Sequence, residues 1–458
     1  MSSLLSLRTR PPPTVLAVRH QTRGAAQKAA PARMSVQTVG GARKNKEHWK
    51  AKVAMEMKHT SRDLPVYAQM PPDRLRASRN DPIDPLLKSD VKFDLPQFNR
   101  KTITPENIGK IASFSLADGT PGQVFGVPKS MWLEFRLMPK PFSVIRKITY
   151  EATHLLQRAA ATPSAANRVV LTGRAGCGKS YVLHQVVTHA AYNGWIVLYV
   201  PRASNLTNST TPYTYDLRTQ TYQQPADAHR TLRQLLAGNT RELSSLVLEE
   251  DVVVERGVFG KALSLADVVR AVVRERGGSG SACVVLEAVM RALEKQTKFP
   301  VLLAVDDVQA LYRKTAYKDA FFNAVQPFHL SMPRMILEYA SGKRSFARGA
   351  FLSALTTSDT TNPIPQELVD ALELTDTHPS SPYDKRSREL VGYAAGLKAL
   401  DVPGRLSAGE AAGVFGAWIG ARVIGAGNYD ELFVSKLTES DGNARDFVRR
   451  GLLASFEP

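Results

Sequence analysis

Residues 173–180 read GRAGCGKS and match the G-x-x-x-x-G-K-[ST] pattern of a phosphate-binding loop in full. In such loops backbone amides surround the β-phosphate, and side chains at the glycines would obstruct them. The lysine reaches the β- and γ-phosphate oxygens, and the hydroxyl residue ligates Mg²⁺. The pattern therefore predicts a nucleotide site made of Gly173, Arg174, Ala175, Gly176, Cys177, Gly178, Lys179, Ser180 and the adjoining Tyr181.

Two adjacent aspartates follow the apolar run VLLAV, where nucleotide-binding proteins of this class place acidic residues. We expect Asp306 to help Ser180 hold Mg²⁺. Asp307 stands where many such ATPases carry a glutamate that polarises the attacking water, so it is the catalytic candidate only if hydrolysis occurs. Because aspartate is one methylene shorter, and such chemistry is sensitive to displacements of about 1 Å, we expect slow turnover. The alternative is a strand end with two solvated acids.

Three further side chains are candidates for sensing the nucleotide. Thr356 and Thr357 follow the apolar stretch FLSAL, and Arg445 opens a helix after the Gly-Asn turn of DGNARDF. Polar residues end most strands and basic residues start many helices, so each assignment keeps an ordinary structural alternative. Arg386 and Arg388 lie in a charged loop, and neither is marked out as an arginine finger.

These residues need a sheet and helices to position them. The pattern predicts strands at 168–172, 194–201, 299–307 and 349–359. It predicts helices within 139–161 and near 180–191, 225–236, 264–276, 284–295 and 411–427. Residues 202–224 have the composition of a long loop. Strands alternating with helices indicate an α/β fold with a parallel, doubly wound sheet.

The charge distribution favours a polyanionic partner such as nucleic acid. The 458 residues carry a net charge of +18, with 43% hydrophobic and 22% charged residues, which is typical of a globular protein. Residues 1–46 hold nine lysines and arginines and no acid, so the remaining chain still carries +9. This leader has the composition of a mitochondrial transit peptide. A basic nucleic-acid-binding arm is the alternative.

The segment SGKRSFARG at 341–349 places several cations around Phe346. It is either a solvated basic loop or a contact to RNA phosphates. The two cysteines are too few for a disulfide framework or a cysteine metal site, which fits a reducing compartment.

The order of motifs resembles that of the mitochondrial small-subunit ribosomal GTP-binding family, known in animals as death-associated protein three. The resemblance covers roughly residues 130–458 and is weakest in the N-terminal arm. Besides GRAGCGKS, it is carried by WIVLYVP, QQPADAHRTLRQLLAGN, VLLAVDD, SGKRSFARGAFLSAL and GNARDF. The QQP and SGKRSF segments discriminate better than the phosphate loop, which many unrelated proteins share.

This resemblance implies an AAA-like P-loop domain at 130–362 and a helical lid at 363–458, preceded by an extended arm at 47–129 and the 1–46 leader. It implies GTP or GDP with Mg²⁺, ATP being the alternative, because the Asn-Lys-x-Asp segment that selects guanine in other GTPases is absent. The implied partners are small-subunit rRNA and neighbouring ribosomal proteins in the mitochondrial matrix. A working AAA-type nucleoside triphosphatase that remodels or assembles other components is the competing function.

Overall fold

A computed structural model describes residues 94–136, 138–254, 257–274, 281–374, 383, 385–421, 424 and 429–455. Contacts divide the chain into two units, Met1–Leu75 and Arg76–Pro458, and every described residue belongs to the second. The predicted leader at 1–46 and the first part of the predicted arm, 47–93, lie outside the described residues.

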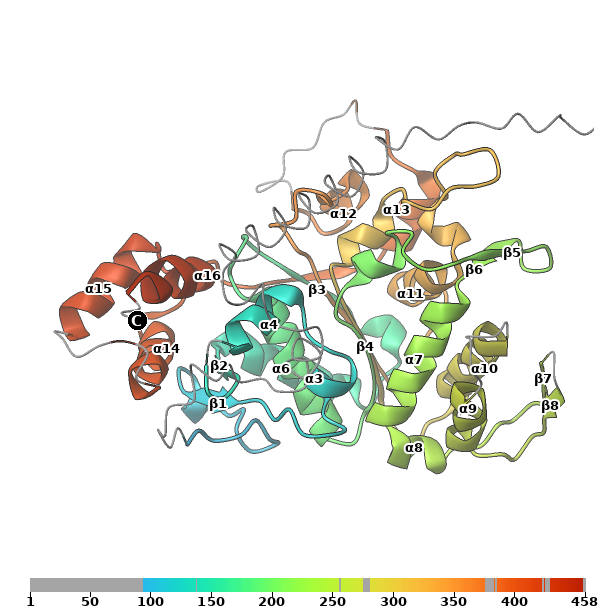
Figure 1. Ribbon diagram of the computed structural model, residues 1–458, viewed down its shortest axis with the longest axis horizontal. Coiled ribbons are helices and arrows are strands. Elements are labelled where there is room, and N and C mark those ends of the chain that lie inside the picture. The colour runs from blue at the N-terminus through green and yellow to red at the C-terminus, as the bar shows by residue number, and fades with distance from the viewer. Residues whose placement is uncertain are drawn as a thin grey trace, which may run out of the picture. The chain divides into compact units, whose positions relative to one another are not determined.

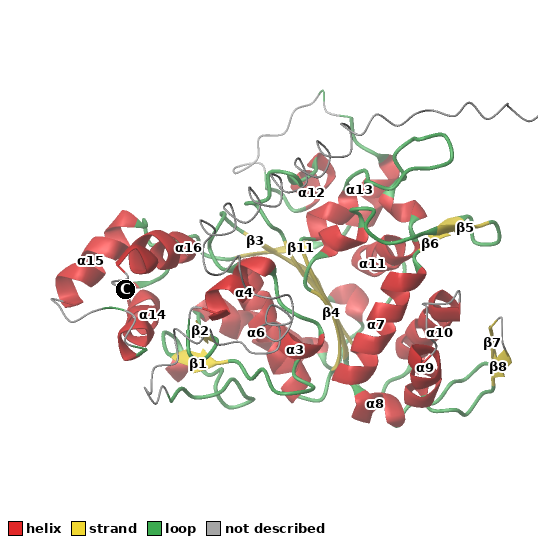
Figure 2. Cartoon of the chain, in the orientation of Figure 1, coloured by secondary structure: helices red, strands yellow, loops and turns green. Residues whose placement is uncertain are grey.

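A five-stranded parallel sheet forms the centre of the described unit (Figures 1 and 2). Its order is β11-β3-β10-β9-β4, so the sensor strand β10 lies between the phosphate-loop strand β3 and the Asp306 strand β9. The strands are β3 (Arg168–Thr172), β4 (Ile196–Val200), β9 (Val301–Asp306), β10 (Gly349–Ala354) and β11 (Lys398–Asp401). Every neighbouring pair is parallel, which confirms the predicted fold class.

Helices cover both faces of this sheet because its strands are apolar on both sides. Along β9, Leu302 and Ala304 pack with α5 (Lys147–Ala159) and α6 (Lys179–Tyr192). Leu303 and Val305 point to the opposite face. That face is covered by α7 (Pro225–Gly238), α9 (Leu265–Arg274), α10 (Ser281–Lys295) and α11 (Ser331–Ser341). Figure 1 shows α6 and α7 on opposite sides of the sheet.

Most predicted elements are confirmed, but the predicted loop at 202–224 is only partly a loop. It contains the hairpin of β5 (Thr214–Asp216) and β6 (Thr221–Gln223), in which Tyr215 pairs with Tyr222. Tyrosine and threonine fit a pleated surface, yet the polar composition hid the alternation. β10 ends at Ala354, five residues before the predicted end, because the polar TTSD run leaves the sheet.

Two predicted domain boundaries need correction. Residues 398–401, inside the predicted lid, form the edge strand β11 of the main sheet, a strand too short to show a pattern. Within the predicted arm, β1 (Ile111–Ser113) pairs with β2 (Phe142–Val144), and Phe98 and Phe114 are buried. The described part of the arm is therefore packed and not extended. The C-terminal helices α14 (Ala408–Gly420) and α15 (Tyr429–Glu439) share a core with Val144.

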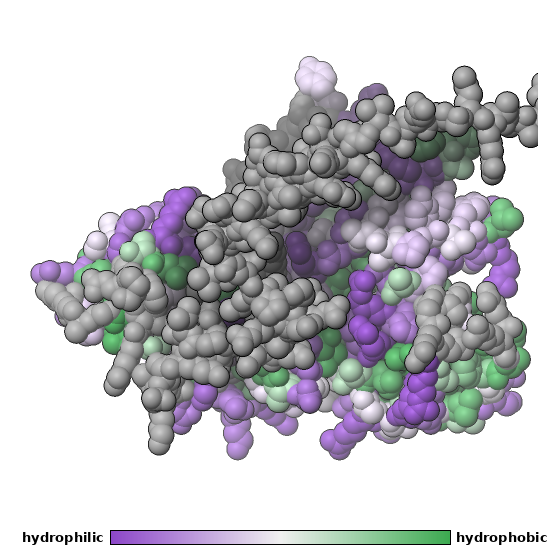
Figure 3. Space-filling model, in the orientation of Figure 1, coloured by the Kyte–Doolittle hydropathy of each residue, from purple (hydrophilic) through white to green (hydrophobic). Residues whose placement is uncertain are grey.

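Within the described residues, the remaining α-helices and strands are short connections around this core. They are α3 (Pro121–Val124), α4 (Lys129–Arg136), α8 (Thr240–Ser244), β7 (Val252–Val254), β8 (Gly257–Phe259), α12 (Gln366–Ala371), α13 (Arg388–Ala394) and α16 (Ala444–Asp446). Figure 3 shows apolar surface near the β7–β8 hairpin, where Val253 and Val258 are 70% and 62% exposed. Among the described residues, no helix has the length and apolarity to cross a membrane.

Candidate functional site

The predicted phosphate loop lies between the end of β3 and the start of α6. Gly173, Gly176 and Gly178 have φ values of 125°, 80° and 98°, which side-chain-bearing residues rarely adopt. A Cβ at Gly173 would lie 2.6 Å from the carbonyl of Val402, and one at Gly176 would collide with the Asn443 side chain. The glycines thus leave the backbone close to its neighbours, as a loop that binds phosphate through amides requires.

Lys179 begins α6 and turns its ammonium back over the loop. Nζ donates to the carbonyls of Gly173 and Arg174, both at 2.8 Å, and to Thr357 Oγ1 at 3.2 Å. Burial lowers the pKa of this lysine, although the charge of Asp306 opposes the effect. A nucleotide phosphate would offer the ammonium a charged acceptor in place of these neutral carbonyls, so the arrangement fits such a ligand.

Ser180 and Asp306 meet as the sequence predicts for a Mg²⁺ site. The Ser180 side chain hydrogen-bonds to Asp306, and burial followed by the charge of Asp307 raises the pKa of Asp306 to about 7. The described residues hold no cluster of three or more His, Cys, Asp or Glu side chains able to bind a metal. Two oxygen donors fit Mg²⁺ bound mainly by phosphates and water, whose charge would favour the ionised carboxylate.

Asp307 lies next to the sensor strand rather than beside Lys179. Its side chain hydrogen-bonds to Thr356 and Ser204, while burial raises its pKa. Its backbone is left-handed, with φ 58°, and its amide donates to Asp306 Oδ1 at 3.0 Å. Of the two threonines, Thr357 therefore contacts Lys179 and Thr356 contacts Asp307. The catalytic role of Asp307 and the nucleotide contact of Thr356 remain predictions.

The C-terminal segment binds the phosphate loop directly through Arg445 and Asn443. The amide of Arg445 donates to the carbonyl of Gly176 at 3.0 Å, and its Nη2 donates to Ser358 Oγ at 3.1 Å. Asn443 caps α16 and donates from Nδ2 to the carbonyl of Ala175 at 2.8 Å. The structure thus brings Arg445 to the loop. Asn443 was missed, although its N-cap position before a short helix was a readable signal.

Arg146 is a second residue that sequence reasoning missed. It precedes α5, its side chain is 6% exposed, and Nη1 donates to the carbonyl of Cys177 at 2.6 Å. Nε bonds Glu410 at 3.2 Å, and Nη2 donates to the carbonyls of Pro403 and Arg405. One guanidinium therefore joins the phosphate loop to the link before α14. A lone arginine ahead of a helix gives no sequence signal of such a role.

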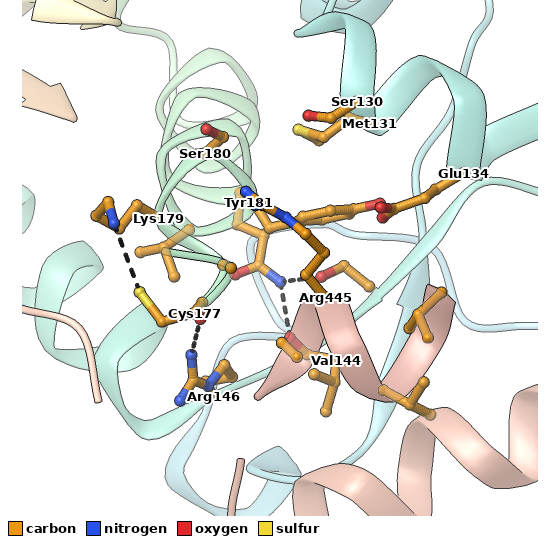
Figure 4. Close-up of a pocket in the computed structure, with 18 of the residues that line it drawn as sticks. Ser130, Met131, Glu134, Val144, Arg146, Cys177, Lys179, Ser180, Tyr181 and Arg445 are labelled. Atoms are coloured by element: carbon orange, nitrogen blue, oxygen red, sulfur yellow. Dashed lines mark hydrogen bonds between the residues drawn. The ribbon is translucent and has the colours of Figure 1, made fainter. Parts of the chain in front are cut away.

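A pocket adjoins the loop between α4, α6, α14 and α16. Lys179 and Cys177 lie at one side of it, while Tyr181 points toward Glu134 at the other (Figure 4). Lining residues also include Gly176, Gly178, Ser180, Thr356, Thr357 and Arg445. The exposed Arg174 is 3.7 Å from Asp441, and Ala175 is also exposed. Most of the predicted site residues are therefore gathered around one cavity.

Segment 341–349 was predicted to be either a solvated basic loop or a contact to RNA phosphates, and the structure agrees with neither role for the whole segment. Arg344 is 16% exposed and binds Glu287 and Glu294 at 2.9 Å and 2.6 Å, so its guanidinium is committed to a protein ion-pair cluster. Phe346 is buried, and Arg348 donates to the carbonyls of Ala160 and Thr297. These contacts pin the segment that leads into β10 and leave Arg344 and Arg348 engaged within the protein.

Comparisons with known proteins agree with the motif order. A family model described as mitochondrial ribosomal death-associated protein 3 matches residues 143–450. Small ribosomal subunit protein mS29 of Neurospora crassa is 23% identical over 368 residues, covering 76% of each chain. The mS29 proteins of Schizosaccharomyces pombe and Bos taurus are 25% and 26% identical, covering 50% and 45% of this chain and 49% and 52% of theirs.

Among solved structures, the ADP form of the Aeropyrum pernix ORC2 protein is similar to this chain, with 14% sequence identity and a TM-score of 0.33. The similarity covers 67% of this chain and 60% of the ORC2 chain.

Proposed function

The chain belongs to the mitochondrial ribosomal death-associated protein 3 family, and from this premise we propose that it is a component of the mitochondrial small ribosomal subunit in which a bound nucleotide acts as a structural clasp. By this we mean that the nucleotide joins the sheet core to the C-terminal segment and so stabilises the fold. Relatives named small ribosomal subunit protein mS29 support the ribosomal role and a location in the mitochondrial matrix. The expected partners are small-subunit rRNA and adjacent ribosomal proteins.

The observation that carries the clasp is the direct bonding of the C-terminal segment to the phosphate loop. Asn443 and Arg445 bind the carbonyls of Ala175 and Gly176, and Arg445 also reaches Ser358. A nucleotide held by this loop would touch both the sheet core and the C-terminal segment. Its binding free energy would then stabilise the folded state, as for any ligand that binds only the native protein.

We assign guanine nucleotide and Mg²⁺ as the ligands of this loop. Gly173, Gly176 and Gly178 would present amides, Lys179 would bind phosphate oxygens, and Ser180 with Asp306 would hold the metal. Mg²⁺ would neutralise phosphate charge when bound. Turnover is expected to be slow because Asp307 is shorter than glutamate and its side chain bonds Thr356 and Ser204.

Melting of the purified chain with and without Mg²⁺-GDP tests the clasp. At 100 times Kd the ligand adds about 2.7 kcal/mol, so the wild-type melting temperature rises with GDP concentration. Lys179→Ala should abolish this rise, whereas Lys314→Ala, which removes an exposed lysine, should preserve it. A wild-type protein that melts at the same temperature with and without GDP would refute the clasp.

Sedimentation of the tagged full chain from a mitochondrial lysate tests the ribosomal role separately. Co-migration with small-subunit rRNA at both moderate and high salt is expected of an integral component. Recovery of the protein only in light fractions at high salt would contradict that role and favour a transient factor or a free nucleoside triphosphatase.

A further inference from the structure

The pocket beside the phosphate loop extends away from Lys179 into a mostly apolar chamber. Met131, Phe142, Trp418 and Val448 line it, and Glu134 is the one acid among the described lining residues. A flat aromatic base suits apolar walls with a few fixed polar groups. The chamber adjoins the loop through Tyr181, which lies two residues after Lys179 in α6.

Glu134 is fixed in this chamber by two partners from distant parts of the chain. Its Oε2 accepts from the Tyr181 hydroxyl at 2.6 Å, and its Oε1 accepts from Arg449 Nε at 3.1 Å. The glutamate side chain is 17% exposed. An arginine and a hydroxyl both donate to this carboxylate, so it acts as a hydrogen-bond acceptor on both oxygens.

The carboxylate keeps acceptor capacity for a ligand. Two carboxylate oxygens offer about four lone-pair positions, and the Tyr181 bond occupies one of the two on Oε2. Arg449 holds the other oxygen through two nitrogens, with Nε 3.1 Å and Nη2 3.0 Å from Oε1, and its side chain is 38% exposed at the rim, so it has solvent to turn into. A ligand edge with two adjacent donors would bind both carboxylate oxygens by displacing Arg449 from Oε1 while the Tyr181 bond stays on Oε2.

We propose that Glu134 is the residue that selects guanine at this site, an inference that rests on the proposed function and names the group that recognises its base. The guanine edge presents N1–H and the N2 amino group side by side, and a carboxylate accepts from both. Adenine presents the acceptor N1 at the equivalent edge, so an acceptor-only carboxylate repels it. Glu134 thus supplies from α4 the acidic group that the missing Asn-Lys-x-Asp segment supplies elsewhere.

The test compares GDP, XDP and ADP binding to the purified full chain with Mg²⁺, by calorimetry. Xanthine carries an oxygen where guanine carries the amino group, so the wild type should bind GDP at least tenfold more tightly than XDP or ADP. Hydrogen bonds to charged groups make tenfold to about a hundredfold changes reasonable. Glu134→Gln should weaken GDP by such a factor and strengthen XDP, because an amide offers xanthine both an acceptor and a donor.

Two further variants separate base selection from phosphate binding. Lys179→Ala should weaken all three nucleotides alike, while Glu151→Gln, which changes an exposed glutamate on α5, should leave all three affinities unchanged. If the wild type binds GDP but not preferentially, or if Glu134→Gln keeps the GDP preference, the role of Glu134 is refuted and the clasp stands. If the wild type binds none of the three, the clasp is refuted together with this inference.

Discussion

Replacing Arg146 by methionine tests whether one buried guanidinium joins the phosphate loop to the C-terminal helices. The side chains of Arg146 and Glu410 are 6% and 7% exposed, with Nε and Oε2 3.2 Å apart. Methionine fills much of the same volume but donates nothing. It would leave Glu410 as a buried charge without its cation, and the Cys177 carbonyl without this donor.

The expected loss is about 3–5 kcal/mol in the free energy of unfolding, the cost of removing one partner from a buried ion pair. Glu410 keeps the amide of Ser407, at 3.1 Å, so the lower half of this range is the better expectation. Adding Glu410→Gln removes the stranded charge. The double variant should therefore be more stable than the sum of the two single losses predicts, by at least about 1 kcal/mol.

Urea unfolding of the nucleotide-free chain measures these differences, followed by circular dichroism and tryptophan fluorescence to test for a single transition. Arg146→Lys is the matched control, because it keeps a cation and should lose less than methionine does. A loss below about 1 kcal/mol for Arg146→Met, or additive losses in the double variant, would refute this account of the guanidinium.

Three other perturbations address the core and the acidic pair. Burial lowers the pKa of His184 and His189 to about 4, so the unfolded chain takes up protons below pH 6.5 while the folded chain does not. The contribution of these histidines to the free energy of unfolding is therefore full above about pH 6.5 and falls by about 2 kcal/mol per histidine by pH 5. In urea unfolding, His184→Gln should remove about half of the combined loss. Unchanged pH dependence in that variant would contradict this assignment. Gly349→Ala would place a Cβ against a backbone carbonyl of β9 at φ 140°, and should lower the free energy of unfolding by more than about 3 kcal/mol. Gly416→Ala in α14 has open space around it, so it should leave the stability unchanged or raise it by up to about 1 kcal/mol. Similar melting temperatures for the two variants would argue against the clash at Gly349. Asp307→Asn should change GDP affinity less than about threefold and abolish the slow hydrolysis expected of the wild type. If the wild type instead hydrolyses nucleotide at a rate near 1 s⁻¹ and this variant does not, the protein is a working enzyme.

The sequence sufficed for those parts of the fold whose pattern is local. The phosphate loop, the apolar run ending at Asp306 and most of the long helices are each readable from consecutive residues, and the structure forms them where predicted; the helix predicted at 411–427 is instead α14, which ends at Gly420. The strand 398–401 was not readable because four residues with two exposed polar ends carry no period. Its place beside β3 is decided by tertiary pairing.

The candidate site divides in the same way. Lys179, Ser180 and Asp306 follow from motifs, while Arg146 and Glu134 depend on contacts between segments more than 40 residues apart. Arg344 shows the opposite error. In the sequence it belongs to a basic segment that suggested an exposed or RNA-binding loop, but in the fold it pairs with Glu287 and Glu294 in an internal cluster. Charge composition indicates a partner, but only the fold shows which charges are already neutralised.

The position of β11 has a consequence for how the chain must be made. The strand that completes the sheet beside the phosphate loop is more than 220 residues downstream of the strand it pairs with. Until residues 398–401 have left the ribosome or crossed a membrane, β3 has an unpaired edge of amides and carbonyls. Pairing over such a separation is slow, and an open edge invites association with other chains. Nascent chains of this protein therefore need protection of that edge until residues 398–401 arrive.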